Sequence, residues 1–320
     1  MQFTREEIEA ARRTVHAAMP PTPQHAWPLL AERLGAQVVV KHENHTPVGA
    51  FKIRGGLTYV EHLARTRPAV RHLVSATRGN HGQSLGFAVR RHGLAATIVV
   101  PHGNSVEKNA AMRSLGVTLV EHGDDFQAAS EHAAHLAQQD GLHRVPSFHR
   151  ELVRGVATAY VELFEALAEA PPEVLYVPIG LGSGLAGAAA ARAHCGVPTR
   201  LVGVVSAHAT AYLDSLRAGR PVDAPAHTRL ADGMACRSPD AQALEVIRRE
   251  ADEVIAVTDE EVGEAMRLLF TATHNVAEGA GAAALAAALQ QRGRAGRVGV
   301  VLSGGNVDAE VFAGVLRPAD

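Results

Sequence analysis

The sequence predicts an α/β protein of two lobes, each built on a mostly parallel sheet flanked by helices. A chain of 320 residues is longer than one simple core usually holds. Short apolar stretches rich in β-branched residues alternate with helical stretches, as in parallel sheets with helical crossovers. The hydrophobic content of 47% is that of a globular chain. We expect a large lobe of residues 1–65 and 150–320 and a small lobe of residues 66–149.

The elements follow from local signals along the chain. A helix is expected over residues 4–18, because Thr4 and Glu7 form a capping-box pattern, and the prolines of 20–23 end it. Apolar runs predict strands at 38–41, 73–76, 96–101, 117–120, 174–179, 201–205 and 298–302. Further helices are expected at 84–89, 125–139, 155–168, 186–193, 259–273 and 281–289.

Composition excludes several classes of function. A net charge of −2 and 4% aromatic residues give no basis for a nucleic-acid surface, and no apolar run is long enough to cross a bilayer. The polar N-terminus lacks a signal core, and Cys195 and Cys236 form no CxxC pair. We therefore expect a cytoplasmic protein with no nucleic-acid or membrane partner. His132 and His135 share a helical face, but no third metal ligand lies near them in sequence.

Lys52 is the first candidate for chemistry. It stands between Phe51 and Ile53, directly after the turn signal of residues 46–49. An apolar setting disfavours the charged ammonium, lowers its pKa and makes the free amine available as a Schiff-base former. The alternative is a surface lysine whose stem lies on apolar neighbours. These residues alone leave both interpretations open.

A glycine-rich loop follows the expected strand at 174–179. Its residues 180–184 suit an anion, because small residues expose backbone amides and a helix N-terminus follows. Residues 182–187 also match the GxGxxG dinucleotide fingerprint. That fingerprint requires an acidic residue after the next strand, and residues 204–208 contain none. An NAD site is therefore the weaker interpretation.

Several segments together resemble one known family. Glu43–Asn44 and the Gly-Ala-Phe-Lys-Ile-Arg-Gly-Gly run of 49–56 are similar to the lysine motif of the fold-type II pyridoxal phosphate enzymes, whose fold is that of the tryptophan synthase β chain. The closest resemblance is to the serine/threonine dehydratase and serine racemase group. It covers nearly the whole chain, and the other matching segments are 77–83, 180–184, 229–233, 278–281 and 303–306.

The resemblance implies roles for individual residues. Lys52 would carry pyridoxal 5'-phosphate as an internal aldimine. The implied cofactor-binding residues are Lys52, Phe51, Asn80, Gly180, Gly182, Ser183, Gly184, Glu278 and Ser303. The implied substrate-binding residues are Thr77, Arg78, Asn80 and His81. The family usually has more consecutive glycines in the phosphate loop, where this chain has Leu181 and Ser183.

Two further departures from the family affect the chemistry. Relatives commonly have serine at the position of Arg78, and in the racemase that serine is the second acid/base. Arginine keeps its proton, so racemisation is less expected; Arg78 would pair with a substrate carboxylate, turn to solvent or pair with an acid such as Glu278. Many relatives also bind a divalent cation where this chain has Ser206 and Tyr212, so we predict no metal site.

The resemblance implies a PLP-dependent ammonia-lyase. The expected reaction is β-elimination from a 3-hydroxy amino acid such as L-threonine or L-serine, which yields a 2-oxo acid and ammonia. Alternatives are a lyase for another 3-hydroxy amino acid, such as 3-hydroxyaspartate, an amino-acid racemase, and more distantly an NAD-binding α/β protein. We expect a homodimer.

Overall fold

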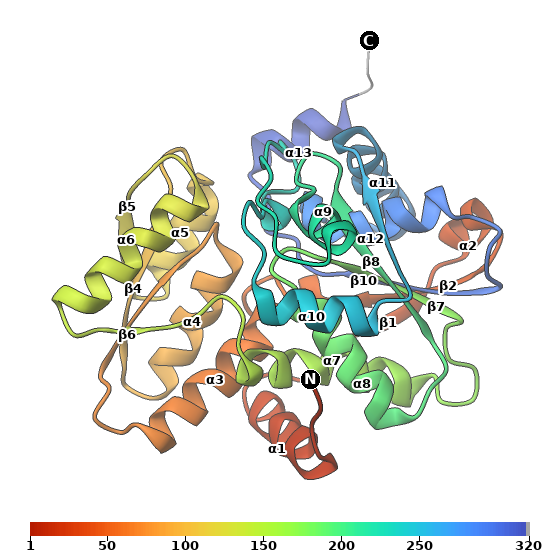
Figure 1. Cartoon of the computed structure of the whole chain (residues 1–320). Helices are drawn as coiled ribbons and strands as arrows, with labels where there is room; N and C mark the ends of the chain where they lie inside the picture. Colours follow the sequence, from red (N-terminus) through yellow and green to blue (C-terminus); the bar gives the residue numbers. More distant parts are fainter. Residues whose placement is uncertain (318–320) are drawn as a thin grey trace.

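Two separate β-sheets form the framework of the computed structural model, which describes residues 1–317 (Figure 1). The larger sheet has the strand order β1-β2-β10-β7-β8-β9. Its strands are β1 (Gln24–Ala26), β2 (Gln37–His42), β10 (Arg297–Leu302), β7 (Val174–Pro178), β8 (Arg200–Ser206) and β9 (Glu253–Val257). All neighbours pair in parallel except β1 and β2, which are antiparallel.

The smaller sheet is wholly parallel and has the order β5-β4-β3-β6. Its strands are β3 (His72–Ala76), β4 (Ala95–Val100), β5 (Thr118–Glu121) and β6 (His143–Arg144). It is flanked by helices α4 (Asn80–Arg91), α5 (Val106–Ser114) and α6 (Phe126–Gln139). We call these strands and helices the small lobe and the rest of the chain the large lobe. The boundaries 66 and 149 remain a prediction.

Helices cover both faces of the larger sheet, because each face buries its own apolar cluster. The helices on the first face are α1 (Arg5–His16), α7 (Arg150–Ala166), α8 (Ser183–Cys195), α9 (Ala211–Ala218) and α10 (Ala241–Glu250). Those on the second face are α2 (Pro28–Leu34), α11 (Asp259–Thr273), α12 (Gly279–Gln290) and α13 (Ala309–Leu316). Helix α12 is buried along almost its whole length, which its alanine-rich sequence permits.

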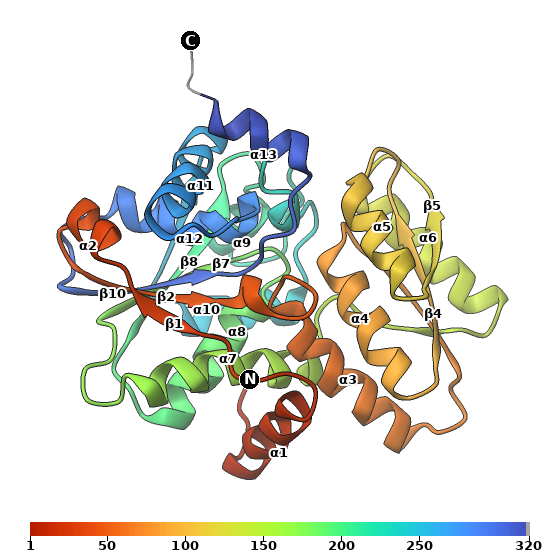
Figure 2. The ribbon, with the colours of Figure 1, turned by 180° about the vertical axis from the view of Figure 1, so that it is seen from behind.

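Helix α3 (Lys52–Thr66) joins the two lobes (Figure 2). It packs against α4 of the small lobe and against α7 and α1 of the large lobe. Glycines allow the close approach: a Cβ atom on Gly155 of α7 would collide with the carbonyl oxygen of Arg54. The reactive lysine expected from the sequence therefore begins the helix that spans the lobes.

The predicted strands and helices form, with ends shifted by up to five residues. The capping box of α1 is present, with Thr4 and Glu7 exchanging both hydrogen bonds. The sequence analysis missed the shorter elements β1, α2, α5, β6, α9, α10, β9 and α13. Within residues 1–317, no helix combines the length and apolar character needed to span a membrane.

Candidate active site

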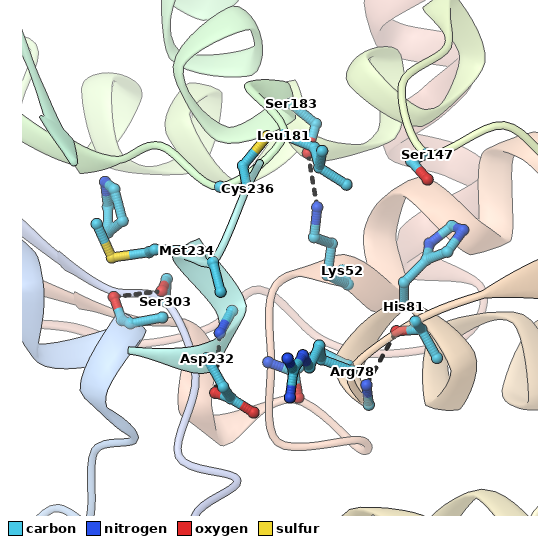
Figure 3. Close-up of a pocket in the computed structure, with 18 of the residues that line it drawn as sticks. Lys52, Arg78, His81, Ser147, Leu181, Ser183, Asp232, Met234, Cys236 and Ser303 are labelled. Atoms are coloured by element: carbon cyan, nitrogen blue, oxygen red, sulfur yellow. Dashed lines mark hydrogen bonds between the residues drawn. The ribbon is translucent and has the colours of Figure 1, made fainter. Parts of the chain in front are cut away.

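One pocket lies where loops from the two lobes meet (Figure 3). The loops that follow β3, β7 and β10 line it, so the carboxyl ends of strands from both sheets face it. All residues that the sequence singled out for cofactor or substrate line this pocket: Phe51, Lys52, Thr77, Arg78, Asn80, His81, Gly180, Gly182, Ser183, Gly184, Glu278 and Ser303. The structure thus brings together residues that are more than 250 positions apart in the sequence.

Lys52 points into the pocket rather than along the protein surface. Its Nζ donates a hydrogen bond to Ser183 Oγ at 3.0 Å, drawn as a dashed line in Figure 3, and lies 4.9 Å from the Phe51 ring centroid. Burial lowers the pKa of Lys52 to about 8. A useful fraction of the free amine is therefore present near neutral pH, as a Schiff-base former requires.

Backbone contacts hold Lys52 in place. The Phe51 amide donates to the Ser303 carbonyl at 3.0 Å, and Ala50 forms a bridge with Gly304. On the other side, Ser84 Oγ donates to the Lys52 carbonyl at 2.6 Å. The lysine is thereby tied to the end of β10 and to helix α4, which limits its movement.

The loop before α8 has the form of an anion site. Gly182 caps the helix with φ 90°, a backbone conformation that favours glycine, and no side chain caps the helix. The first amides of α8 therefore have no helical acceptor and are open toward the pocket. A Cβ atom on Gly180 would collide with the Gly233 carbonyl oxygen, so glycine at this position allows the loop to lie close to Gly233. Ser183, beside Lys52, adds a hydroxyl.

Another part of the pocket is lined by Asn80, Glu278 and Ser303. Asn80 Nδ2 donates to Glu278 Oε1 at 2.6 Å, and Asn80 Oδ1 accepts from Asn306 Nδ2 at 2.8 Å. Ser303 Oγ donates to the Ala280 carbonyl at 3.3 Å. The sequence analysis assigned Asn80 to the cofactor and the substrate, whereas here its amide also links the small lobe to the large lobe.

The loop after β3 contributes Thr77, Arg78 and His81. Thr77 Oγ1 accepts from the Gly79 amide at 2.9 Å, so this side chain shapes the loop. His81 Nε2 is buried, and burial together with nearby Lys52 lowers the pKa of His81 to about 3. His81 is therefore a neutral wall of the pocket. Arg78 is half-buried, and its Nε is buried without a hydrogen-bond partner.

Lys108 and Asp232 also line the pocket. Asp232 lies in segment 229–233, which the family resemblance places close to the cofactor, whereas Lys108 was not predicted. Lys108, from α5, lies 2.8 Å from Asp232 and 2.9 Å from Glu278. Burial alone would lower the pKa of Lys108, but the carboxylates of Glu278 and Asp232 outweigh it and raise the pKa. Burial raises the pKa of Glu278, against the opposing effect of Lys108. The Ser105 cap of α5 was the only sequence signal near Lys108.

The two positions where many relatives place metal ligands have local partners. Ser206 Oγ accepts from the His208 amide at 3.1 Å. Tyr212 is buried, and its hydroxyl accepts from the Asp240 amide at 3.3 Å. Neither side chain supplies the carboxylate oxygen that calcium or magnesium prefers.

The residues of the pocket fit a phosphate-bearing aldehyde. The open amides of α8 and the glycine cradle suit a dianionic phosphate. Within residues 1–317, two lysines line the pocket. In this part of the chain, Lys108 pairs with carboxylates, whereas the Lys52 amine, next to the start of α8, pairs with none. Phe51 offers an apolar ring beside it. These features are the ones that pyridoxal phosphate requires.

Comparison with known proteins identifies the family. Residues 15–304 match the family described as pyridoxal-phosphate dependent enzyme. The chain is 32% identical to the L-threonine ammonia-lyase of Thermotoga maritima over 98% of this chain and 78% of the relative. It is also 32% identical to the L-threo-3-hydroxyaspartate ammonia-lyase of Pseudomonas sp over 92% of this chain and 93% of the relative.

A solved structure gives the same result. The crystal structure of the threonine deaminase of T.th. superposes with a TM-score of 0.86 and 32% identity, covering 95% of this chain and 98% of that one. The match excludes the dinucleotide interpretation of residues 182–187, because the family's cofactor is pyridoxal phosphate. The chain therefore belongs to the pyridoxal-phosphate dependent enzymes.

Proposed function

We propose that the protein is an ammonia-lyase that converts a 3-hydroxy amino acid such as L-threonine or L-serine to a 2-oxo acid and ammonia by β-elimination and hydrolysis. The observation that carries the proposal is the Lys52 amine at 3.0 Å from Ser183, at the open N-terminus of α8. The similarity to ammonia-lyases over nearly the whole chain supports the reaction type.

Each part of the pocket has a task in this reaction. Bound pyridoxal phosphate supplies an electron sink for the electron pair left when the substrate loses its α-proton. Lys52 would hold the cofactor, and its free amine would take the α-proton at Nζ. Its pKa of about 8 allows the amine to act as a base near neutral pH. The phosphate would be held by backbone amides and one hydroxyl of the loop residues Gly180, Gly182, Ser183 and Gly184.

The other predicted residues orient the reactants. Asn80 and Ser303 would contact the cofactor ring, and Glu278 holds the Asn80 amide through a hydrogen bond of 2.6 Å. Neutral His81 excludes water without adding charge. Loss of the 3-hydroxyl as water leaves an enamine, which water hydrolyses to a 2-oxo acid and ammonia.

Two alternatives to threonine or serine dehydration concern the same pocket. A lyase for 3-hydroxyaspartate is supported by the similarity to the Pseudomonas enzyme of that name. A racemase needs a second acid/base on the other face of the substrate. Arg78 holds its proton too firmly for that role. We therefore rank racemisation below elimination.

The variant Lys52→Ala tests the proposal. The wild-type protein, purified with pyridoxal phosphate, should show the visible absorption band of a covalently bound cofactor. It should also release a 2-oxo acid and ammonia from at least one 3-hydroxy amino acid. Both properties should be lost in Lys52→Ala and in Lys52→Arg, which keeps the positive charge but not the nucleophilic amine. Circular dichroism checks that the variants are folded.

Retention of near wild-type turnover in Lys52→Ala would overturn the assignment of Lys52. A folded wild-type protein that holds the cofactor but acts on no 3-hydroxy amino acid would overturn the reaction. Formation of D-serine from L-serine, followed in parallel, would favour the racemase.

We also infer that the protein works as a homodimer in the cytoplasm. Cys195 and Cys236 are free thiols, as expected in a reducing compartment. The dimer is an expectation from the family resemblance. Sedimentation equilibrium of the holoenzyme measures it directly, and a monomer mass at the working concentration would exclude it.

A further inference from the structure

Arg78 is a cation of the pocket without an anionic partner. It lines the pocket, and Figure 3 shows its side chain on the same side of the pocket as Asp232, below Lys52 in that view. Its Nε is buried and has no hydrogen-bond partner, and no acid within residues 1–317 forms an ion pair with Arg78. Leaving a charged guanidinium half-buried and unpaired is costly, so this position favours an anion beside Arg78.

The acidic side chains that line the pocket beside Arg78 are paired with other cations, and the exposed Asp124 and Asp223 of the neighbouring cavity form no ion pair with it. Lys108 holds both Asp232 and Glu278, at 2.8 and 2.9 Å. Arg237 forms an ion pair with Asp125 at 2.6 Å, and both residues line a second cavity that Arg78 also lines. The expected alternative in which Arg78 pairs with Glu278 is therefore wrong. A bound molecule is therefore the best source of an anion for Arg78 inside the pocket.

The cofactor phosphate and the substrate α-carboxylate each have a separate candidate binding site. The phosphate belongs at the open end of α8, in the glycine cradle. The N-terminus of α4, a helix of 12 residues, also lies in the pocket, and no side chain caps it. The amides of Asn80, His81 and Gly82 there have no helical acceptor and form a site for one carboxylate. Arg78 precedes this site in the chain and remains for a second anion.

We propose that Arg78 selects substrates whose side chain carries a carboxylate on C3, the class of the 3-hydroxy amino dicarboxylic acids. This inference rests on the proposed ammonia-lyase function and names its substrate class. A guanidinium presents parallel N–H donors that match the two oxygens of a carboxylate, which lysine does not. The α-carboxylate binds at α4 and the side-chain carboxylate at Arg78, so the 3-hydroxyl between them is held in place for elimination.

The reaction on such a substrate is balanced without a further reactant. The α-proton and the 3-hydroxyl leave together as water, and the C–O bond breaks as the C=C bond forms. Water then hydrolyses the resulting enamine, which yields a 2-oxo dicarboxylic acid and ammonia. No oxidant or reductant is needed.

The test compares Arg78→Gln and Arg78→Lys with the wild-type holoenzyme. We expect the wild type to have a higher kcat/KM for L-threo-3-hydroxyaspartate than for L-threonine or L-serine. In Arg78→Gln the value for hydroxyaspartate should fall roughly 10- to 150-fold, the effect of one lost charge-assisted contact, and far more than the values for the other two. Arg78→Lys should show a smaller loss than Arg78→Gln but remain below the wild type, because lysine keeps the charge and lacks the two parallel donors of a guanidinium.

A control variant and a binding measurement make the result specific. Arg237→Gln removes a nearby cation that is already paired with Asp125, and this variant should keep the wild-type order of substrates. Malate should bind to the wild-type holoenzyme more tightly than lactate in a direct binding measurement, and this difference should disappear in Arg78→Gln. The visible cofactor band reports whether each variant retains a formed pocket.

Several outcomes would overturn the inference. An equal loss for all three substrates in Arg78→Gln would place the α-carboxylate on Arg78. No loss for any substrate would remove Arg78 from recognition. An active wild type without preference for the dicarboxylic substrate or for malate would refute the substrate class and leave the ammonia-lyase proposal intact. A wild type inactive on every 3-hydroxy amino acid would refute that proposal instead, while the malate measurement still tests Arg78.

Discussion

At the scale of single residues, Ser206 and Tyr212 determine whether the enzyme depends on a divalent cation. Both have local hydrogen-bond partners and neither has a carboxylate. We expect EDTA treatment followed by gel filtration to leave the rate of 2-oxo acid release unchanged. Added magnesium or calcium should have no effect. A strong loss of activity that either metal restores would contradict this expectation.

The residues of the site were predictable to different degrees. Lys52 and the loop of 180–184 were predicted because each lies in a local pattern with a chemical reason, whereas Asn80 was implied by the family resemblance. Lys108 was missed, because its importance comes from two acids that are more than 100 residues away in the sequence. The isolation of Arg78 was equally invisible, since it depends on which cations the nearby acids have already bound.

At the scale of elements, a buried ionic network fastens β2, α3 and α7 together. Arg54 of α3 has no exposed surface, and it binds Glu43 at 2.7 Å and Glu162 of α7 at 2.6 Å. Lys41 of β2 binds the same Glu162 at 2.6 Å. Arg54 follows Lys52 by two residues on α3, so the network fixes the helix that presents the reactive amine.

This network makes stability depend on acid pH. Burial acts to raise the pKa of Glu162, but Arg54 and Lys41 outweigh it and lower the pKa from 4.5 to about 2. The charged carboxylate therefore adds stability fully above pH 4.5, and this contribution is lost as the pH falls toward 2. Glu162→Gln should lower the free energy of unfolding at neutral pH by roughly 3–5 kcal/mol, the usual cost of breaking a buried ion pair.

The measurement is urea unfolding of the holoenzyme as a function of pH. Between pH 4.5 and 2 the wild type should lose more stability than Glu162→Gln. Glu245→Gln serves as the control, because that residue forms an exposed pair with Arg248 and its loss should cost about 1 kcal/mol or less. Parallel pH curves for wild type and Glu162→Gln would show that Glu162 does not titrate as described.

The elements themselves were predicted best where they are long and periodic. Helix α11 has the expected ends, 259 and 273, because Thr258 and Glu261 form a capping box there. Strand β9 was missed although Glu253–Val257 is rich in β-branched residues. It is an edge strand and only partly buried, so its apolar signal is weak. The two-residue strand β6 is too short to leave a pattern.

At the scale of the whole molecule, Lys108 joins the two lobes. It extends from α5 of the small lobe to Asp232 and Glu278 of the large lobe, across the pocket. Lys108→Met should lower the free energy of unfolding by about 3–5 kcal/mol, because the buried carboxylate of Glu278 loses its cation. Urea unfolding measures this loss.

Two further variants separate the pairing from a general effect. Lys108→Met combined with Glu278→Gln should regain much of the stability, since the buried Glu278 is then uncharged and only the more exposed Asp232 is left without its cation. Arg113→Met, which removes an exposed cation from the same helix, should change stability little. If the double variant is no more stable than Lys108→Met alone, the unpaired carboxylate of Glu278 is not the cause of the lost stability.

The position of β10 has a consequence for how the chain acquires its fold during synthesis. This strand lies between β2 and β7, so residues 297–302 complete a sheet begun at residues 37–42. All strands of the small lobe, by contrast, have been synthesised once residue 144 is added to the chain. The small lobe can therefore fold early, while the apolar edges of β2 and β7 stay unpaired until β10 emerges. Nascent chains halted before Arg297 should depend on a chaperone to remain dispersed.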